Sequence, residues 1–116
     1  MAEVFNNASQ AVTSSETTIY TAPTDAGDIA IVLSLRITNV DGVSDDQITA
    51  NVYQSDGTTK KAAIASTINV PADSSIELAG TSKIVLLEGE MIKLQGVALS
   101  GDLEAYCSVL EIQAQE

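Results

Sequence analysis

The sequence predicts an all-β domain: an antiparallel two-sheet sandwich with an extended N-terminal arm. Three observations lead to this fold class. Apolar and polar residues alternate along several segments, turn signals recur about every 8–16 residues, and no segment longer than about two turns has the period of a helix. A jelly roll of about eight strands is the first expectation. An immunoglobulin-like sandwich is the alternative, although it usually has paired cysteines and a buried tryptophan, and this chain has one cysteine and no tryptophan.

The first segment of the chain differs from the rest. Residues 1–15 are polar and have no sustained alternation, so we interpret them as an arm rather than a strand of the core. Its large apolar residues, Val4 and Phe5, are the candidate anchor on a neighbouring subunit, and a frayed terminus is the alternative. Residues 16–116 form the predicted sandwich, because a chain of 116 residues holds one hydrophobic core.

The predicted strands of the sandwich share a β-branched, aliphatic composition and end at turn signals. Pro23 ends the first strand, Asp56-Gly57 is the best hairpin turn, and Gly80, Glu88-Gly89 and Ser100-Gly101 separate later strands. In order, the predicted strands are residues 16–22, 28–40, 47–54, 61–70, 75–79, 83–87, 91–98 and 103–112.

Two of these strands carry distinctive apolar stripes. In the strand at residues 28–40, a stripe of aliphatic side chains two residues apart is expected to face the core: Ile29, Ile31, Leu33, Leu35 and Ile37. Leu33→Ala is therefore expected to cost about 2–5 kcal/mol. The strand at residues 103–112 places Leu103, Ala105, Cys107 and Val109 on one face. Leu110 and Ile112 fall on the other, which predicts a bulge or burial on both faces.

The composition argues against several classes of function. Sixteen acids and five bases give a net charge of −11, which disfavours binding to nucleic acids and anionic membranes. Without histidine and with Cys107 as its single cysteine, the chain lacks the commonest general base and the usual zinc ligands. We therefore expect no enzyme and no cofactor. No secretory signal or membrane span is visible either, which fits synthesis and assembly in a cytoplasm.

Two small clusters of charge are candidate binding residues. Asp41, Asp45 and Asp46 lie on one predicted loop and offer oxygen ligands for calcium, although their spacing differs from that of an EF-hand. A turn stabilised by these acids is the preferred interpretation. Lys60 and Lys61 form the single basic pair, which fits either an acidic patch on a partner or protection of a strand edge.

Several segments resemble small β-sandwich virion proteins of tailed phages, notably those of marine and cyanobacterial phages. The resemblance covers about residues 16–112, through strand and turn patterns with no diagnostic residue. The matching segments are TTIYTAP at residues 17–23, AIVLSLRITN at 30–39, VPADSSIEL at 70–78, KIVL at 83–86, EGE at 88–90, GDLE at 101–104 and SVLEI at 108–112.

This resemblance implies a capsid decoration protein, also called a cement protein. Such a protein is made in the host cytoplasm, binds the major capsid protein on the outer surface of the virion head and forms homotrimers between capsomers. A tail or fibre module is the first alternative. A carbohydrate-binding module is the second, since jelly rolls often bind sugars on aromatic platforms, for which the chain offers Tyr20, Tyr53 and Tyr106.

Overall fold

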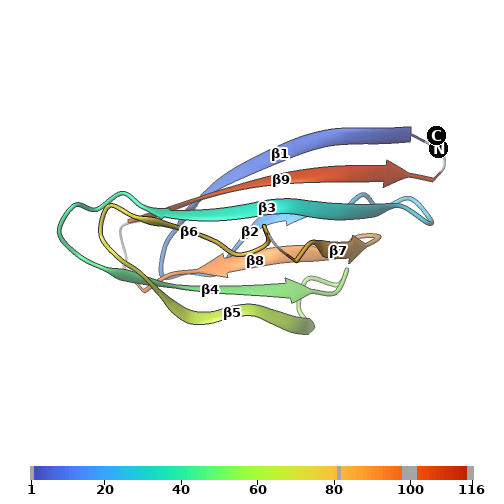
Figure 1. Ribbon diagram of the computed structural model, residues 1–116. Coiled ribbons are helices and arrows are strands. Elements are labelled where there is room, and N and C mark those ends of the chain that lie inside the picture. Colours follow the sequence, from blue (N-terminus) through green and yellow to red (C-terminus); the bar gives the residue numbers. More distant parts are fainter. Residues whose placement is uncertain (1, 81, 98–101, 115–116) are drawn as a thin grey trace.

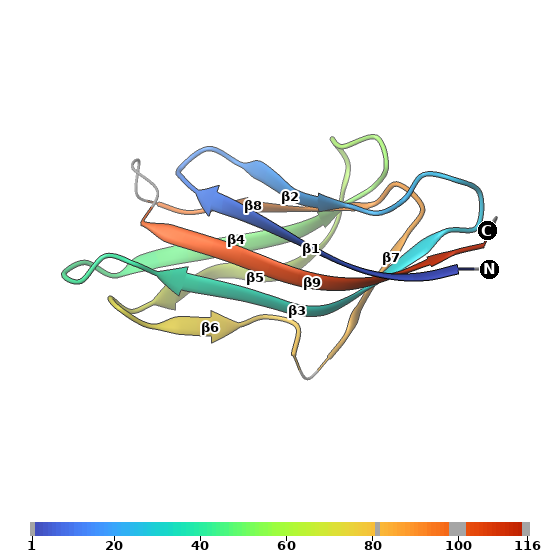
Figure 2. The ribbon, with the colours of Figure 1, turned by 90° about the horizontal axis from the view of Figure 1, so that it is seen from above.

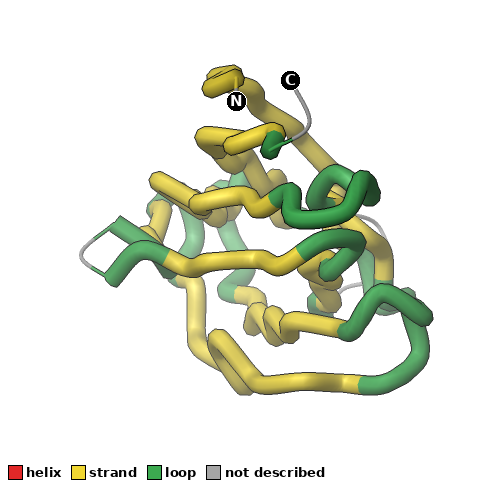
Figure 3. Tube along the Cα trace, turned by 90° about the vertical axis from the view of Figure 1, so that its right-hand side faces the viewer, coloured by secondary structure: helices red, strands yellow, loops and turns green. Residues whose placement is uncertain are grey.

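The computed structural model describes residues 2–80, 82–97 and 102–114, and these residues form strands and loops (Figure 3). None of the described segments is a helix long and apolar enough to cross a membrane. The described strands are β1 (Ala2–Val12), β2 (Thr17–Thr21), β3 (Ile29–Asn39), β4 (Asp46–Tyr53), β5 (Lys60–Val70), β6 (Ser75–Glu77), β7 (Ile84–Leu87), β8 (Met91–Gln95) and β9 (Leu103–Gln113). The predicted all-β class is confirmed.

The strands form two stacked antiparallel sheets (Figures 1 and 2). The first, called sheet A here, has the order β1-β9-β3-β6, with β7 also paired to β3, and the second, sheet B, has the order β2-β8-β4-β5. Because β6 and β7 pair with different parts of β3, they occupy one strand position between them. The chain thus passes between sheets in the order of a jelly roll with eight strand positions, which confirms the predicted sandwich.

The core lies between the sheets and is aliphatic, as the scarcity of aromatic residues predicts. Both sheets contribute side chains that are fully buried because alternate residues of each strand face inward. The largest of these are Val12, Val32, Leu35, Ile37, Ile48, Val70, Leu86, Ile92, Leu94, Leu103 and Val109. Such a core stabilises the fold through burial of apolar surface.

A bulge in β3 corrects the expected core stripe. The register between β3 and β9 shifts between Val32 and Ser34, so the alternation changes phase at Leu33. Leu35 and Ile37 face the core as expected, but Ile29, Ile31 and Leu33 are only partly buried and face the opposite side of sheet A, while Ala30 and Val32 are buried. The prediction that all five residues of the stripe are core residues was therefore wrong for three of them.

Residues 2–12 form β1, which corrects the interpretation of this segment as an arm outside the sheets. β1 pairs with β9 from Ala2↔Gln113 to Val12↔Leu103 without a register shift. Most of its side chains are exposed and Val12 is fully buried, so the segment lacks the alternation that would reveal a strand. Backbone pairing with β9 makes it a strand despite its polar sequence.

The hairpin between β4 and β5 has the turn that the sequence predicts. Gly57 has φ = 75°, which is favourable for glycine because it has no Cβ. The Asp56 carboxylate accepts hydrogen bonds from the N–H groups of Thr58 and Thr59 at 2.9 Å each and from the Thr59 hydroxyl at 2.6 Å. These bonds, led by that from the Thr59 hydroxyl, lower the pKa of Asp56 to about 2.

Candidate interaction surface

An apolar patch covers part of the outer face of sheet A. It consists of two rows of cross-strand neighbours, which lie on the same face because directly paired residues point the same way. One row runs Phe5–Leu110–Ile31–Val85 across β1, β9, β3 and β7, and the next runs Ile112–Ile29–Leu87. We call these seven residues, together with Leu33, the outer patch.

The patch residues on β1 and β7 are the ones most exposed to solvent. Phe5 is 76% exposed, Val85 54% and Leu87 49%, whereas the patch residues of β3 and β9 are partly buried. Its members carry no charge, and Glu3 lies at its border opposite Ile112. Contiguous exposed apolar surface in a soluble protein marks a site of protein interaction.

The phase change in β3 and the end of β9 together create this surface. Leu110 and Ile112 point outward because β9 alternates without interruption, and Ile29 and Ile31 point outward because of the bulge at Leu33. Of the two outcomes expected for the end of β9, the structure shows apolar residues on both faces, and the bulge lies in β3 instead.

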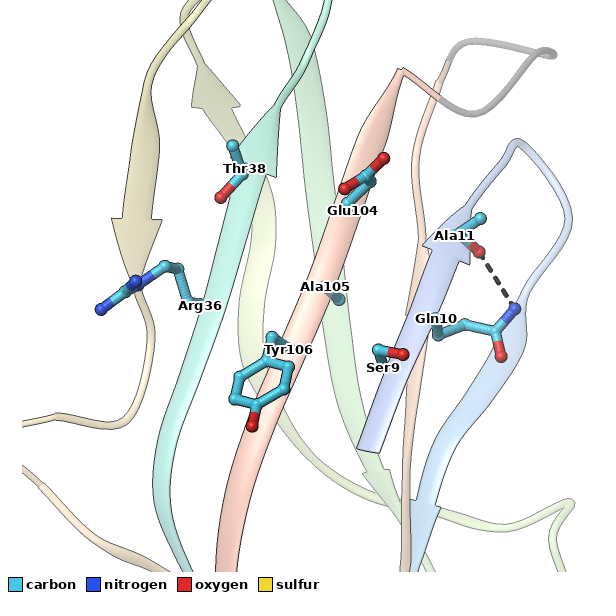
Figure 4. Close-up of a pocket in the computed structure, with 8 residues that line it drawn as sticks. All are labelled: Ser9, Gln10, Ala11, Arg36, Thr38, Glu104, Ala105 and Tyr106. Carbon is cyan, nitrogen blue, oxygen red and sulfur yellow. Dashed lines mark hydrogen bonds between the residues drawn. The ribbon is translucent and has the colours of Figure 1, made fainter. Parts of the chain in front are cut away.

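Next to the outer patch, the same face becomes polar. Figure 4 shows Tyr106 and Glu104 along β9, with Arg36 and Thr38 of β3 on one side and β1 on the other. Tyr106 is the cross-strand partner of Arg36, and Glu104 is the partner of Thr38. These side chains line an open hollow next to the outer patch. The outer face of sheet A therefore has one apolar half and one polar half.

The outer face of sheet B, by contrast, is polar. Thr49 pairs with Gln95, Asn51 pairs with Lys93, and the Lys93 ammonium lies 4.7 Å from the centre of the Tyr53 ring. The Tyr53 hydroxyl also hydrogen-bonds to Glu16 at 2.8 Å. Sheet A is therefore the better candidate for adhesion to another protein.

The tyrosines do not form a common sugar-binding platform. Tyr20 is 7% exposed in the core, Tyr53 is covered by Lys93 on sheet B, and Tyr106 is 48% exposed on sheet A. A carbohydrate platform needs accessible aromatic faces close together, and the three rings lie in three different environments.

The structure separates the residues proposed to bind a partner. Val4 and Phe5 point to opposite faces of β1: Phe5 belongs to the outer patch, while Val4 lies on the inner face opposite Glu111. Lys60 and Lys61 begin β5, the edge strand of sheet B. The two pairs lie in different sheets and do not form one site.

Lys61 also has a structural role. Its ammonium forms an ion pair of 2.5 Å with Glu90, a nearly buried residue whose carboxylate also accepts the Leu87 N–H at 2.9 Å. Burial alone would raise the pKa of Glu90, but the hydrogen bonds from Lys61 and Leu87 outweigh it and lower the pKa below its usual value. The Lys61 ammonium therefore already has an ion-pair partner within the domain.

The acidic loop residues are occupied by hydrogen bonds within the loop and its neighbours. Asp41 accepts the N–H groups of Val43 and Ser44, Asp45 accepts that of Ala72 at 3.0 Å, and the nearly buried Asp46 accepts those of Gln47 and Val97. Within the described ranges, no group of three or more acidic, cysteine or histidine side chains is placed to hold a metal ion. The calcium hypothesis thus gains no support from the geometry.

The sequence analysis missed a buried polar contact between the sheets. The Tyr20 hydroxyl donates a 2.5 Å hydrogen bond to Glu111, which is 8% exposed, and Asn6 approaches the same carboxylate oxygen at 3.5 Å. Burial, followed by the hydrogen bond and negative charge of Glu111, raises the pKa of Tyr20 far above its ordinary value. Glu111 lies two residues after Val109, in the same inward-facing alternation as Cys107 and Val109. This spacing was the sequence signal that could have predicted the burial of Glu111.

Comparisons with known proteins show a shared fold. No family model and no curated protein matches the sequence. A structure of Bacillus endospore appendages, described as disulfide-linked pili, aligns with a TM-score of 0.58 at 18% identity over 97% of this chain and 87% of that chain. A structure of infectious bursal disease virus, Gx strain, aligns with a TM-score of 0.45 at 18% identity over 97% of this chain and 29% of that chain. The first likeness is one of fold, at low sequence identity.

Proposed function

We propose that the chain is a structural protein that adheres to other protein through the outer patch, and that it decorates the outside of a tailed-phage head. The patch is the observation that carries this proposal, because it is an apolar surface across four paired strands at which a flat protein surface can dock. The resemblance of residues 16–112 to phage virion proteins supplies the identity of the partner, the major capsid protein.

The charge of the chain suits such a role. A net charge of −11 limits non-specific association of free copies, while the uncharged outer patch remains available for docking. Each contact with the shell can be weak, because the copies of a homo-oligomer bind several sites at once. The capsid surface of the virion is then the site of action.

A matched pair of valine variants tests the proposal. Val85 is 54% exposed in the outer patch and Val43 is 90% exposed in a loop, so Asp at either position is expected to leave the core intact. Phage heads assembled without this chain are mixed with each purified variant and sedimented. Val85→Asp should weaken binding at least about tenfold, equal to about 1.4 kcal/mol, whereas Val43→Asp should bind like the native chain.

Two results would count against this proposal. Equal binding by Val85→Asp and the native chain would remove the outer patch as the docking surface. If the native chain binds purified tails and not heads, the alternative of a tail or fibre module is the correct one.

A further inference from the structure

The outer edge of β1 is a long strand edge with no partner among the described residues. β1 begins sheet A, with β9 on one side only. It has 11 residues, which correspond to roughly 36 Å of extended backbone. Free edges of this kind expose a row of backbone N–H and C=O groups that another strand can pair with.

The remaining edges of the two sheets are shorter or irregular. β2 has five residues and a register shift, while β6 and β7 have three and four residues. β5 is as long as β1, but its pairing with β4 shifts at three places, Thr67 has φ = 48°, and Lys60 and Lys61 begin it. Bulges and edge lysines are the devices that prevent strand addition.

β1 has none of these protective devices. Its pairing with β9 runs without a shift, and its sequence AEVFNNASQAV contains no Lys, Arg or Pro and one charged residue, Glu3. An edge that is long, free of bulges and nearly neutral is open to pairing, whereas the other described edges are shorter or irregular.

Hydrogen bonds in β1 show which backbone groups face the free edge. The Asn7 N–H donates to the side chain of Asn6 at 2.8 Å, and the Ala11 carbonyl accepts a bond from the Gln10 side chain at 3.1 Å. Because backbone groups alternate in direction along a strand, the odd-numbered residues of β1 point theirs away from β9. The side chains of Asn6 and Gln10 bond to two of these backbone groups, and an added strand would displace them.

We propose that β1 pairs antiparallel with β1 of a second copy about a two-fold axis at Asn7. This register uses the whole strand, because Ala2 then meets Val12 and every residue between them has a partner. Isologous contacts of this type are the commonest in soluble oligomers. The two A sheets become one continuous sheet.

The same register is compatible in charge and in shape. Glu3 meets the partner's Ala11, so the single charge of each β1 stays away from its copy, and Phe5 packs beside the partner's Ser9. A two-fold axis perpendicular to the sheet keeps both outer patches on one side. The dimer therefore presents a doubled apolar surface, whereas a strand from an unrelated protein offers no such match.

Dimer formation is expected to rise with salt concentration. Each copy carries a net charge of −11, and salt screens this repulsion over roughly 8 Å at physiological ionic strength. Backbone pairing at the β1 edge does not depend on ion pairs, so added salt removes the repulsion without weakening the contact.

A cysteine pair of variants tests this contact without any phage component. Directly opposite residues in a hydrogen-bonded antiparallel pair have Cα atoms about 5.5 Å apart, which suits a disulfide. Asn7→Cys should therefore form a covalent dimer on mild oxidation. Asn69→Cys is the matched control, because Asn69 is exposed on β5, and it should remain monomeric on a non-reducing gel, as should the native chain with its buried Cys107.

Light scattering on lysine variants tests the non-covalent contact. Native protein should have the mass of a dimer, and Asn7→Lys should be monomeric because two lysines then meet at the axis. Asn69→Lys changes the net charge equally and should remain dimeric. A native mass of one or three chains, or a dimer that survives Asn7→Lys, would overturn the proposal. Binding to heads through the outer patch is measured separately, so either proposal can fail alone.

Discussion

Two leucines two residues apart in β3 are expected to differ greatly in their contribution to stability. Leu35 is fully buried, whereas Leu33 lies on the outer face of sheet A in a hollow with Phe5 and Tyr106. The perturbation is truncation of each leucine to alanine. The contrast tests the bulge directly, because uninterrupted alternation would bury both side chains equally.

The expected magnitudes follow from the two environments. Leu35→Ala leaves a cavity between the sheets and should lower the free energy of unfolding by about 2–5 kcal/mol. Leu33→Ala removes a partly buried side chain at the surface and leaves no enclosed cavity, so the expected loss is about 1 kcal/mol. At about 4 °C per kcal/mol for a domain of this size, the melting temperatures of the variants should differ by at least about 4 °C.

Urea unfolding followed by far-ultraviolet circular dichroism provides the assay. Equal denaturant slopes for the native chain and both variants would show that midpoint changes report stability. The reasoning fails if Leu33→Ala destabilises as much as Leu35→Ala, because the phase change in β3 would then be wrong. Leu33→Ala should also weaken head binding, since Leu33 belongs to the outer patch.

Three further predictions concern the buried hydrogen bond, the acidic loop and β1. Tyr20→Phe leaves the Glu111 carboxylate without its main donor and should cost about 1–3 kcal/mol in urea unfolding; an unchanged midpoint would show that the bond contributes nothing. Burial and the charges of Asp41 and Asp46 raise the pKa of Asp102. A group with a raised folded pKa stabilises at low pH and loses that contribution as pH rises, so Asp102→Asn should raise the melting temperature at pH 7 but not below the ordinary pKa of aspartate; an equal gain at both pH values would contradict this. Deletion of residues 1–12 should lower the melting temperature, because β9 loses its partner along the whole of β1 and the buried Val12 is removed; a fully stable truncated domain would restore the arm interpretation.

Most strands could be predicted from the sequence, because the alternation of apolar and polar residues is visible within each segment. The segments predicted as strands between residues 16 and 112 correspond to β2 through β9, and the turn at Asp56-Gly57 lies where its residue types require it. β1 was missed because its stability comes from backbone pairing with β9, which begins about ninety residues later in the chain. No pattern within residues 1–15 reports that partner.

The candidate site was predictable only in part. Phe5 was identified as an anchor and does lie in the outer patch, but its supposed companion Val4 faces the other way. Val85 and Leu87 were not recognised, because nothing local distinguishes an outward apolar residue of a short strand from a core residue. Their exposure became evident once β7 paired with β3.

By itself, the sequence determined the all-β class, the aliphatic core, the turn at Asp56-Gly57 and the net negative charge, since each follows from composition or from neighbours a few residues apart. Tertiary structure decided which half of the β3 stripe faces the core, that β1 forms an edge of sheet A, and that Glu111 meets Tyr20. The physical reason is that alternation places successive side chains on opposite faces without specifying which face meets the other sheet. A single bulge at Leu33 reverses that assignment, and only pairing between distant strands reveals it.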